Sequence, residues 1–412
     1  MKHRPAVLMV ILLVLIFHVQ LPLQAKMPQP YPHLAGTLPS VEEALLKALQ
    51  QRGLEERVWR IAADSNGHLV VTSLVFASPV ASPQAPSLIE RYAWNLVRTA
   101  FEAVPSLGEV DLTAYPNGSV PFLRGGGGAT FTAAVSREEF LRLERTDPVG
   151  VLRTLPRVWF DPLLAHPAPL RSISRRPSSP SWSYQENRPT FRGLVQEQVE
   201  ELWLRIMGRV RGGTIEGRLY RGDPRRRAVA LTFDDGPVPL YTPLLLDTLS
   251  RLGVKATFFL IGQHVREYPY FAQAIVQAGH EVGNHSFHHG NLARLPPERV
   301  WEEINWTQET IARVAGEAPR YFRPPGGDYN ATVLRVARQF GLVTVFWTDN
   351  PGDYLNLDPQ VLETRLFLRA SNGGIILLHQ GIPGTLRVLP VITRILRRYG
   401  LEITTVSGLL TP

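Results

Sequence analysis

The sequence predicts an α/β protein in which a barrel or near-barrel of parallel strands follows a smaller α+β domain. Over residues 221–412, short apolar strand patterns alternate regularly with helical patterns. Such alternation is typical of a parallel sheet with helical crossovers, and the number of repeats suggests closure or near-closure. Residues 38–165 follow a different, mixed order. A segment rich in Pro, Ser and Arg, 166–192, separates the two regions and is expected to be a linker.

Composition limits the function classes. The chain has 412 residues, of which 44% are hydrophobic and 19% charged, which is ordinary for a globular protein of two domains. It has no cysteine, so disulfides and thiolate chemistry are excluded. A net charge of +8 suits an anionic neighbour such as a wall polymer or a lipid headgroup. No basic strip is interleaved with aromatic residues, so nucleic acid is not an expected partner.

Residues 1–25 have the pattern of an export signal. A basic start is followed by a short apolar run, and Ala25 precedes Lys26. The run is shorter than the ~20 residues of a membrane span. Leu23 is a poor residue for cleavage after Ala25, so an uncleaved N-terminal anchor in contact with the membrane is the alternative. Either way we expect an extracytoplasmic protein, secreted or anchored at the cell envelope.

Residues 38–165 read as a small α+β domain of unknown role. The glycines at 125–128 are not followed by Lys-Ser/Thr, so we expect a hairpin tip there and not a phosphate-binding loop. The patterns predict helices at 41–52, 87–104 and 137–144, and strands at 58–76 (turned at Asn66-Gly67), 108–115 and 129–135.

A lead-in segment, 193–220, carries apolar residues at helical spacing over 194–210 and should enter the second domain as a helix. In that domain we expect the following elements in order: strand 228–233, helix 242–252, strand 256–261, helix 265–278, strand 281–284, helix 297–315, a strand around Tyr321, helix 331–340, strand 343–347, helix 359–370, strand 375–378, helix 386–399 and strand 402–406.

Two adjacent carboxylates end the first of these strands. Asp234 and Asp235 follow alternating β-formers and precede Gly236-Pro237, which places them at the strand's C-terminal edge. Consecutive strand residues point in different directions, so the two acids should have different roles, such as metal ligand and general base. Alone, an Asp-Asp-Gly sequence is more often a simple turn.

A histidine pair follows the strand at 281–284. His285 and His289 are four residues apart, a spacing that puts both rings on one face of a helical turn. Such a pair is weak evidence by itself. Combined with a strand-end Asp, it predicts a two-His, one-Asp site for a divalent metal, zinc first, with cobalt, nickel or iron as substitutes.

Three more polar motifs follow or end later apolar runs: Arg323-Pro324-Pro325-Gly326-Gly327, Trp347-Thr348-Asp349-Asn350-Pro351-Gly352-Asp353-Tyr354 and Ile375-Ile376-Leu377-Leu378-His379-Gln380. With the first two motifs, the order resembles the polysaccharide deacetylases of the NodB-homology type, carbohydrate esterase family 4. The resemblance covers about 221–410. It implies a distorted (β/α) barrel of about seven strands and a hydrolase acting on linear amides.

The resemblance also implies roles. Asp235, His285 and His289 would hold the metal, Asp234 would be the general base, and His379 the general acid. The backbone N–H of Gly326 would stabilise the oxyanion, and Leu377 would line the pocket for the acetyl methyl group. Arg323 would orient Asp234, and Asp353 would support either the arginine or the histidine.

Three positions depart from the family pattern: Gly326 replaces a tyrosine, Tyr354 a tryptophan, and Gln380 an aspartate. These departures affect the expected substrate more than the expected activity. We expect N-deacetylation of peptidoglycan first and of chitin-type oligomers next. An O-acetyl polysaccharide esterase, a non-catalytic carbohydrate-binding or scaffolding protein of the wall, and a hydrolase of small non-sugar amides are the alternatives.

Overall fold

The computed structural model describes residues 38–78, 85–116, 129–143, 152–161, 191–355, 358, 360–361, 363–365 and 371–410. The expected signal, the glycines at 125–128 and the linker at 166–190 lie outside these ranges, as does much of the helix expected at 359–370. In the described part of the chain, no helix combines the length and apolarity needed to cross a membrane.

The N-terminal region forms a five-stranded sheet in the order β1-β2-β3-β4-β5. The pair β2–β3 is parallel and α3 connects it, while the other pairs are antiparallel. Strand β5 and the two short 3₁₀ turns were not expected from the sequence. The elements are α2 (Pro39–Gln51), η1 (Glu55–Arg57), β1 (Val58–Ser65), β2 (Val70–Ser78), α3 (Ala85–Ala103), β3 (Glu109–Pro116), β4 (Phe131–Ser136), α4 (Arg137–Leu143), η2 (Leu152–Thr154) and β5 (Val158–Phe160).

Alternation along these strands builds the core of the N-terminal domain. Successive strand residues face opposite sides of the sheet. On β3, Val110, Leu112 and Ala114 enter one hydrophobic cluster with residues of α2 and α3, including the fully buried Trp94. Residues between them, such as Asp111, face the other side of the sheet.

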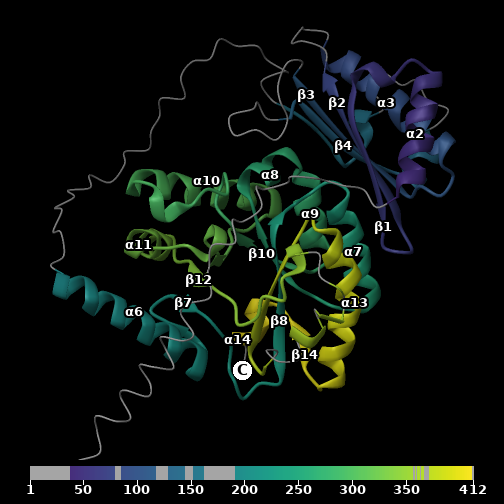
Figure 1. The fold of residues 1–412 in the computed structure, drawn as a ribbon. Helices are drawn as coiled ribbons and strands as arrows, with labels where there is room; N and C mark the ends of the chain where they lie inside the picture. Colours follow the sequence, from purple (N-terminus) through teal and green to yellow (C-terminus); the bar gives the residue numbers. More distant parts are fainter. Residues whose placement is uncertain are drawn as a thin grey trace, which may run out of the picture. The chain divides into compact units, whose positions relative to one another are not determined.

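The second region is a curled sheet in the order β13-β8-β9-β10-β11-β12-β7-β6, with β14 also paired to β8 (Figure 1). Only the β6–β7 pair is antiparallel among the described pairs. A parallel bridge between Asp349 and Ile376 links the stretch after β12 to β13. The strands are β6 (Thr214–Ile215), β7 (Arg218–Leu219), β8 (Ala228–Gly236), β9 (Thr257–Leu260), β10 (Glu281–Asn284), β11 (Tyr321–Phe322), β12 (Val343–Val345), β13 (Gly374–His379) and β14 (Glu402–Thr404). The expected α/β fold with a barrel-like sheet is confirmed.

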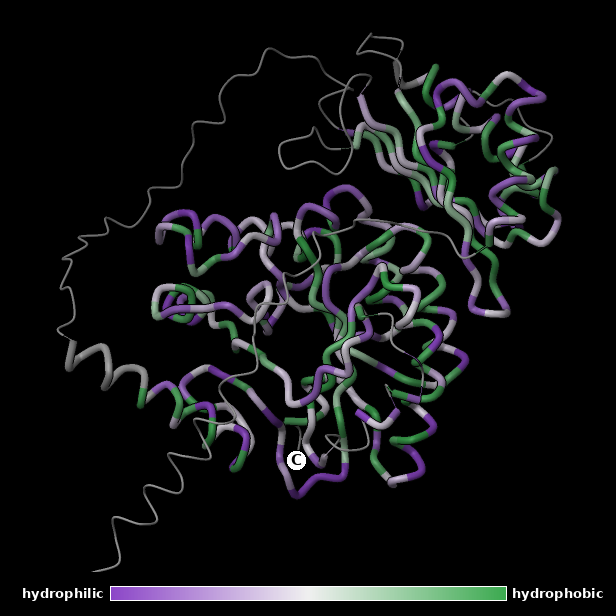
Figure 2. The backbone as a smooth tube through the Cα atoms, in the orientation of Figure 1, coloured by the Kyte–Doolittle hydropathy of each residue, from purple (hydrophilic) through white to green (hydrophobic). Residues whose placement is uncertain are grey.

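Helices and 3₁₀ turns alternate with these strands: α6 (Phe191–Arg211), α7 (Tyr241–Leu252), α8 (Gly262–Glu267), α9 (Pro269–Gln277), η3 (Leu292–Arg294), α10 (Pro297–Ala315), η4 (Pro325–Gly327), α11 (Ala331–Gln339), η5 (Asp353–Leu355), α13 (Pro383–Arg398) and α14 (Val406–Leu410). Figure 2 shows apolar segments along β8 and its neighbours and hydrophilic segments at many of the turns.

Three features differ from the expected elements. The helix expected at 265–278 is two helices, because Pro269 has no N–H to continue the first and instead starts α9. The strand expected at 402–406 ends at Thr404, and α14 follows it. Strands β6 and β7 belong to the barrel sheet although they precede residue 221, where we expected the domain to begin.

Candidate active site

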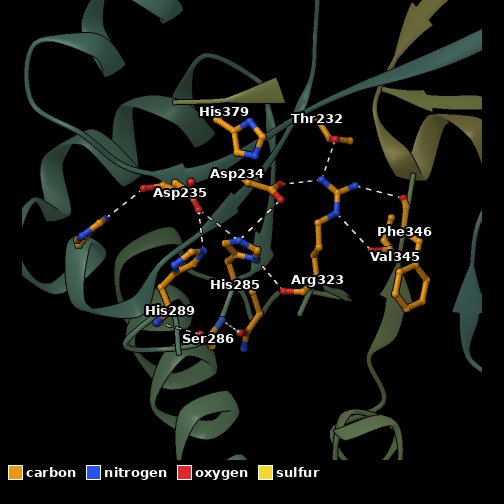
Figure 3. A network of polar contacts seen from close by, with 12 residues as sticks. Thr232, Asp234, Asp235, His285, Ser286, His289, Arg323, Val345, Phe346 and His379 are labelled. Carbon is orange, nitrogen blue, oxygen red and sulfur yellow. Dashed lines mark hydrogen bonds and ion pairs between the residues drawn. The ribbon is translucent and has the colours of Figure 1, made fainter. Parts of the chain in front are cut away.

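The two adjacent carboxylates lie at the C-terminal end of β8, as expected for a parallel sheet that carries chemistry at that edge. Asp234 is buried, and Asp235 is partly exposed with a positive φ of 74°. Figure 3 shows the two side chains diverging, Asp234 toward Arg323 and Asp235 toward the histidines. The different environments fit different roles for the two acids.

The histidine pair lies on a loop and not on a helical turn, so the helical interpretation of its spacing was wrong. The backbone turns sharply after β10 through Ser286 and His289, whose φ values are 64° and 56°. Side chains of the loop stabilise this path: Asn284 Oδ1 accepts from Ser286 N at 2.9 Å, and Ser286 Oγ accepts from His289 N at 3.1 Å. The bent loop still brings both rings to Asp235.

Glu303 of α10 binds the backbone of this loop. The sequence did not predict this role. Glu303 Oε2 accepts from the backbone N–H groups of Phe287 and His288 at 3.0 and 2.8 Å, and its Oε1 lies 2.6 Å from His288 Nδ1. Burial alone would raise the pKa of Glu303, but these contacts hold it below its usual value. His288, which does not face the metal site, therefore helps to fix the loop. A single polar residue on a helix has no distinctive pattern, so the sequence carried no signal for Glu303.

The donor atoms of Asp235, His285 and His289 converge, with all three within 4.8 Å of one another. Asp235 Oδ1 lies 3.4 Å from His285 Nε2 and 3.0 Å from His289 Nε2. His285 Nδ1 donates to the carbonyl oxygen of Arg323 at 2.7 Å, which leaves Nε2 with its lone pair toward the site. Burial would raise the pKa of Asp235, but the charge of His289 and the contacts with the rings of His285 and His289 hold it well below its usual range. Two imidazole nitrogens and one carboxylate oxygen fit a divalent transition metal.

Arg323 fixes Asp234. The arginine is fully buried, and its guanidinium donates to Asp234 Oδ1 at 2.6 Å and to Thr232 Oγ1 at 2.8 Å. The carbonyl oxygens of Val345 and Phe346 accept from its Nε and Nη2, both at 3.3 Å, and its guanidinium carbon lies 4.1 Å from the centre of the Phe259 ring. Burial lowers the pKa of Arg323, and Asp234 counteracts that effect. Asp234 Oδ2 remains on the side of the metal-site histidines, 3.7 Å from His285 Nε2.

Asp353 supports His379 and not Arg323, which decides between the two expected alternatives. Its Oδ1 lies 2.9 Å from His379 Nδ1, and its Oδ2 accepts from His379 N and Thr385 Oγ1, both at 2.7 Å. With a carboxylate acceptor at Nδ1, that nitrogen carries a proton and Nε2 remains for chemistry. Burial alone would lower the pKa of His379, but Asp353, Asp235 and Asp234 raise it to about 9.

The expected substrate-side residues lie in three different elements. Gly326 is exposed in the turn η4 with φ 66°. Leu377 is buried on β13, two residues before His379 and therefore on the same face of the strand. Tyr354 lies in η5, and its side chain is outside the described part of the structure.

Two further residues contact the site: Gln380, which the sequence marked only as a departure from the family pattern, and His264, which the sequence did not indicate. Gln380 is buried, its N–H donates to Asp234 O at 2.9 Å, and Thr242 Oγ1 donates to its Oε1 at 3.0 Å. It packs so closely on Gly236 that a Cβ there would lie 1.6 Å from its Nε2. Gln380 is therefore a buried packing residue. His264 Nδ1 lies 3.2 Å from Asp235 O, and burial lowers the pKa of His264 to about 4.

Several known proteins are similar to part of this chain. The polysaccharide deacetylase family model matches residues 221–345. The peptidoglycan-N-acetylglucosamine deacetylase of Bacillus cereus is 34% identical over 189 residues, 45% of this chain and 88% of that protein. The chitooligosaccharide deacetylase of a Bradyrhizobium species is 35% identical over 43% of this chain and 88% of that protein. The crystal structure of a family 4 carbohydrate esterase pseudoenzyme from Bacillus anthracis is 32% identical over 47% of this chain and 69% of that one, with a TM-score of 0.46.

A barrel-like parallel sheet with acids and histidines at its C-terminal edge defines the class as a hydrolase of the deacetylase type. The chain belongs to the polysaccharide deacetylase family. The resemblance seen in the five motifs is thereby confirmed. Residues 38–161 lie outside the matched segment.

Proposed function

We propose that this protein removes N-acetyl groups from amino sugars of an extracellular polysaccharide, peptidoglycan first and chitin-type oligomers next, with zinc as the metal. One observation supports this most strongly: Asp235, His285 and His289 converge beside an acid fixed by arginine, with a histidine of raised pKa nearby. The names of relatives acting on peptidoglycan and chitooligosaccharides support the substrate class. The basic composition and the export-like N-terminus support an extracytoplasmic site of action, secreted or anchored.

The reaction adds water across an amide and yields acetate and a free amine. A bound divalent ion would polarise the carbonyl and acidify the attacking water. Asp234, held at Oδ1 by Arg323, takes the proton of the water at Oδ2. His379, held at Nδ1 by Asp353, gives a proton from Nε2 to the departing nitrogen as the C–N bond breaks. The N–H of Gly326 would donate to the oxyanion, and Leu377 would contact the acetyl methyl group.

The test is acetate release from purified peptidoglycan and from chitin oligomers, measured before and after chelation and again after zinc or cobalt is returned. We expect release by the wild type that chelation abolishes and metal restores. Asp235→Asn should lose both metal binding and activity. Asp234→Asn should keep the metal and lose activity, because only the base is removed. Asp223→Asn, a matched change at an exposed surface pair with Arg225, should behave as wild type.

Absence of acetate from both polymers with metal bound would contradict the proposal. O-acetylated polysaccharides, xylan included, are then the next substrates to test. Failure on those as well would indicate the non-catalytic carbohydrate-binding alternative.

A further inference from the structure

The N-terminal sheet buries both of its faces. Its apolar face packs on α2 and α3, as described above. The opposite face carries polar residues that a sequence pattern assigns to solvent, yet Asp111, Thr113 and Thr132 have relative exposures of 1%, 2% and 0%. All described residues belong to one compact unit, Leu34–Pro412, so this polar face must be covered within it.

The barrel covers this polar face with the segment where α8 and α9 meet. Thr132 Oγ1 donates to Glu267 O at 2.6 Å, and the hydroxyls of Thr113 and Tyr268 lie 3.3 Å apart. Beside these bonds, Ala134 and Trp159 pack with the aromatic residues Tyr268, Tyr270 and Phe271. Hydrogen bonds within an apolar surround indicate a fixed interface between the two domains.

Helix α7, which follows β8 and Asp235 in the chain, contacts the N-terminal domain at two further points. Asn66, in the β1–β2 turn, donates through Nδ2 to Asp247 Oδ2 at 2.7 Å and contacts Leu244 O and Thr248 Oγ1 at 3.2 and 3.0 Å. At the start of the helix, Asp111 Oδ2 accepts from the backbone N–H of Leu240 at 2.5 Å.

The backbone conformation of Leu240 makes this bond important. It stands five residues after Asp235 and has a positive φ of 70°, which a branched side chain rarely adopts. Such a conformation persists only when its surroundings hold it. The residues between are bonded on the barrel side as well, since Val238 N donates to Thr242 Oγ1 at 2.7 Å. Asp111 supplies the support from the other domain.

We infer that Asp111 is a positioning residue for the metal site, and that the N-terminal domain is a structural part of the catalytic unit rather than a separate glycan-binding module. By fixing Leu240, Asp111 fixes the path of the 236–241 segment and so the position of Asp235. The inference rests on the proposed function only where zinc affinity is the measured quantity. The contacts between the two domains do not depend on that function.

The experiment compares Asp111→Leu with Asp111→Asn in the full chain. Leucine removes the acceptor, whereas the amide oxygen of asparagine keeps it. We expect zinc to bind Asp111→Leu about 10-fold more weakly, in a competition titration against a chelating dye, and kcat to fall with KM nearly unchanged. Asp111→Asn should stay close to wild type. Thr113→Val, a control on the same polar face, removes a bond to Tyr268 and should leave zinc affinity unchanged.

A second measurement needs no folded leucine variant. Hydrogen exchange of the 236–241 segment, followed in the wild type and in Asp111→Asn without metal, should show the amide of Leu240 protected. Fast exchange of that amide in the folded wild type would overturn the inference, and so would wild-type zinc affinity in a folded Asp111→Leu. Failure of the wild type to bind metal would instead contradict the proposed function and leave the exchange result to decide the inference.

Discussion

At the residue scale, the proposed acid role of His379 predicts that its pairing with Asp353 sets the alkaline side of the activity profile. In that role His379 would act only while it is protonated, and the neighbouring carboxylates raise its pKa to about 9. Its contribution is therefore full below the ordinary histidine pKa and is lost as pH rises through the raised value. A bound metal ion would act in the opposite direction and lower that pKa.

Asp353→Asn should move the alkaline limb of kcat/KM to lower pH, because the carboxylate closest to His379 Nδ1 loses its charge. The measurement is a pH profile of acetate release for wild type and variant under saturating zinc. Asp358→Asn, a change of the same kind at an exposed position, is the control. An alkaline limb that stays in place in Asp353→Asn would show that another group controls it.

The sequence predicted the residue types of the site better than their partners. Asp234, Asp235, His285, His289 and His379 come together at one edge of the sheet, because parallel strands bring their C-terminal ends to the same place. The order of the strands does not determine which side chains bond to one another. The sequence therefore left Asp353 with two possible partners. It did not indicate Glu303 or His264, since single polar residues on helices have no distinctive pattern.

At the element scale, helix α10 stabilises the loop that carries His285 and His289, through hydrogen bonds to Glu303. Three donors converge on this buried carboxylate, so Glu303→Gln places an amide N–H₂ against at least one of them. We expect a loss of about 1–3 kcal/mol in the free energy of unfolding, measured by denaturant titration without metal.

The adjacent Glu302 offers a matched control for this change. It lies on the same helix and pairs with Arg299 at the surface, with a third of its side chain exposed. Glu302→Gln should change stability by less than about 1 kcal/mol. Equal losses for the two variants would remove the special role assigned to Glu303.

The sequence predicted the ends of a helix well where Pro or Gly coincides with the end of the apolar pattern. Helix α10 begins and ends at the expected residues, between Pro296-Pro297 and Gly316. The expected helix at 265–278 failed because the apolar pattern continues across Pro269 while the backbone cannot. The prediction of a helical turn for His285 and His289 was wrong for a different reason. Their spacing suits a helix, but hydrogen bonds to the side chains of Asn284 and Glu303 give the backbone another path.

At the scale of the whole molecule, metal binding should stabilise the fold, because the three ligands come from two different strand ends and exist as a site only in the folded chain. Zinc at 100 times its dissociation constant should add about 2.7 kcal/mol to the free energy of unfolding. The measurement is Tm with zinc and with a chelator. Asp235→Asn should show no difference between the two, whereas Asp223→Asn should respond like wild type.

The buried polar face of the N-terminal sheet is what sequence patterns could least predict at this scale. The sequence correctly predicted strands β1 to β4. It could not show that Asp111 and Thr132 are buried, because a polar residue facing solvent and one facing another domain have the same period.

Strand β8 pairs with the last strands of the chain, and this has a consequence for folding during synthesis. Thr232 bonds to Ile376, 144 residues later, and β14 lies beyond that. Contacts so distant in sequence form slowly. During translation, Asp235, His285 and His289 are synthesised well before β13 and β14, which pair with β8. Nascent chains interrupted near residue 373 should therefore present an unpaired apolar strand edge, and they should need a chaperone more than the finished protein does.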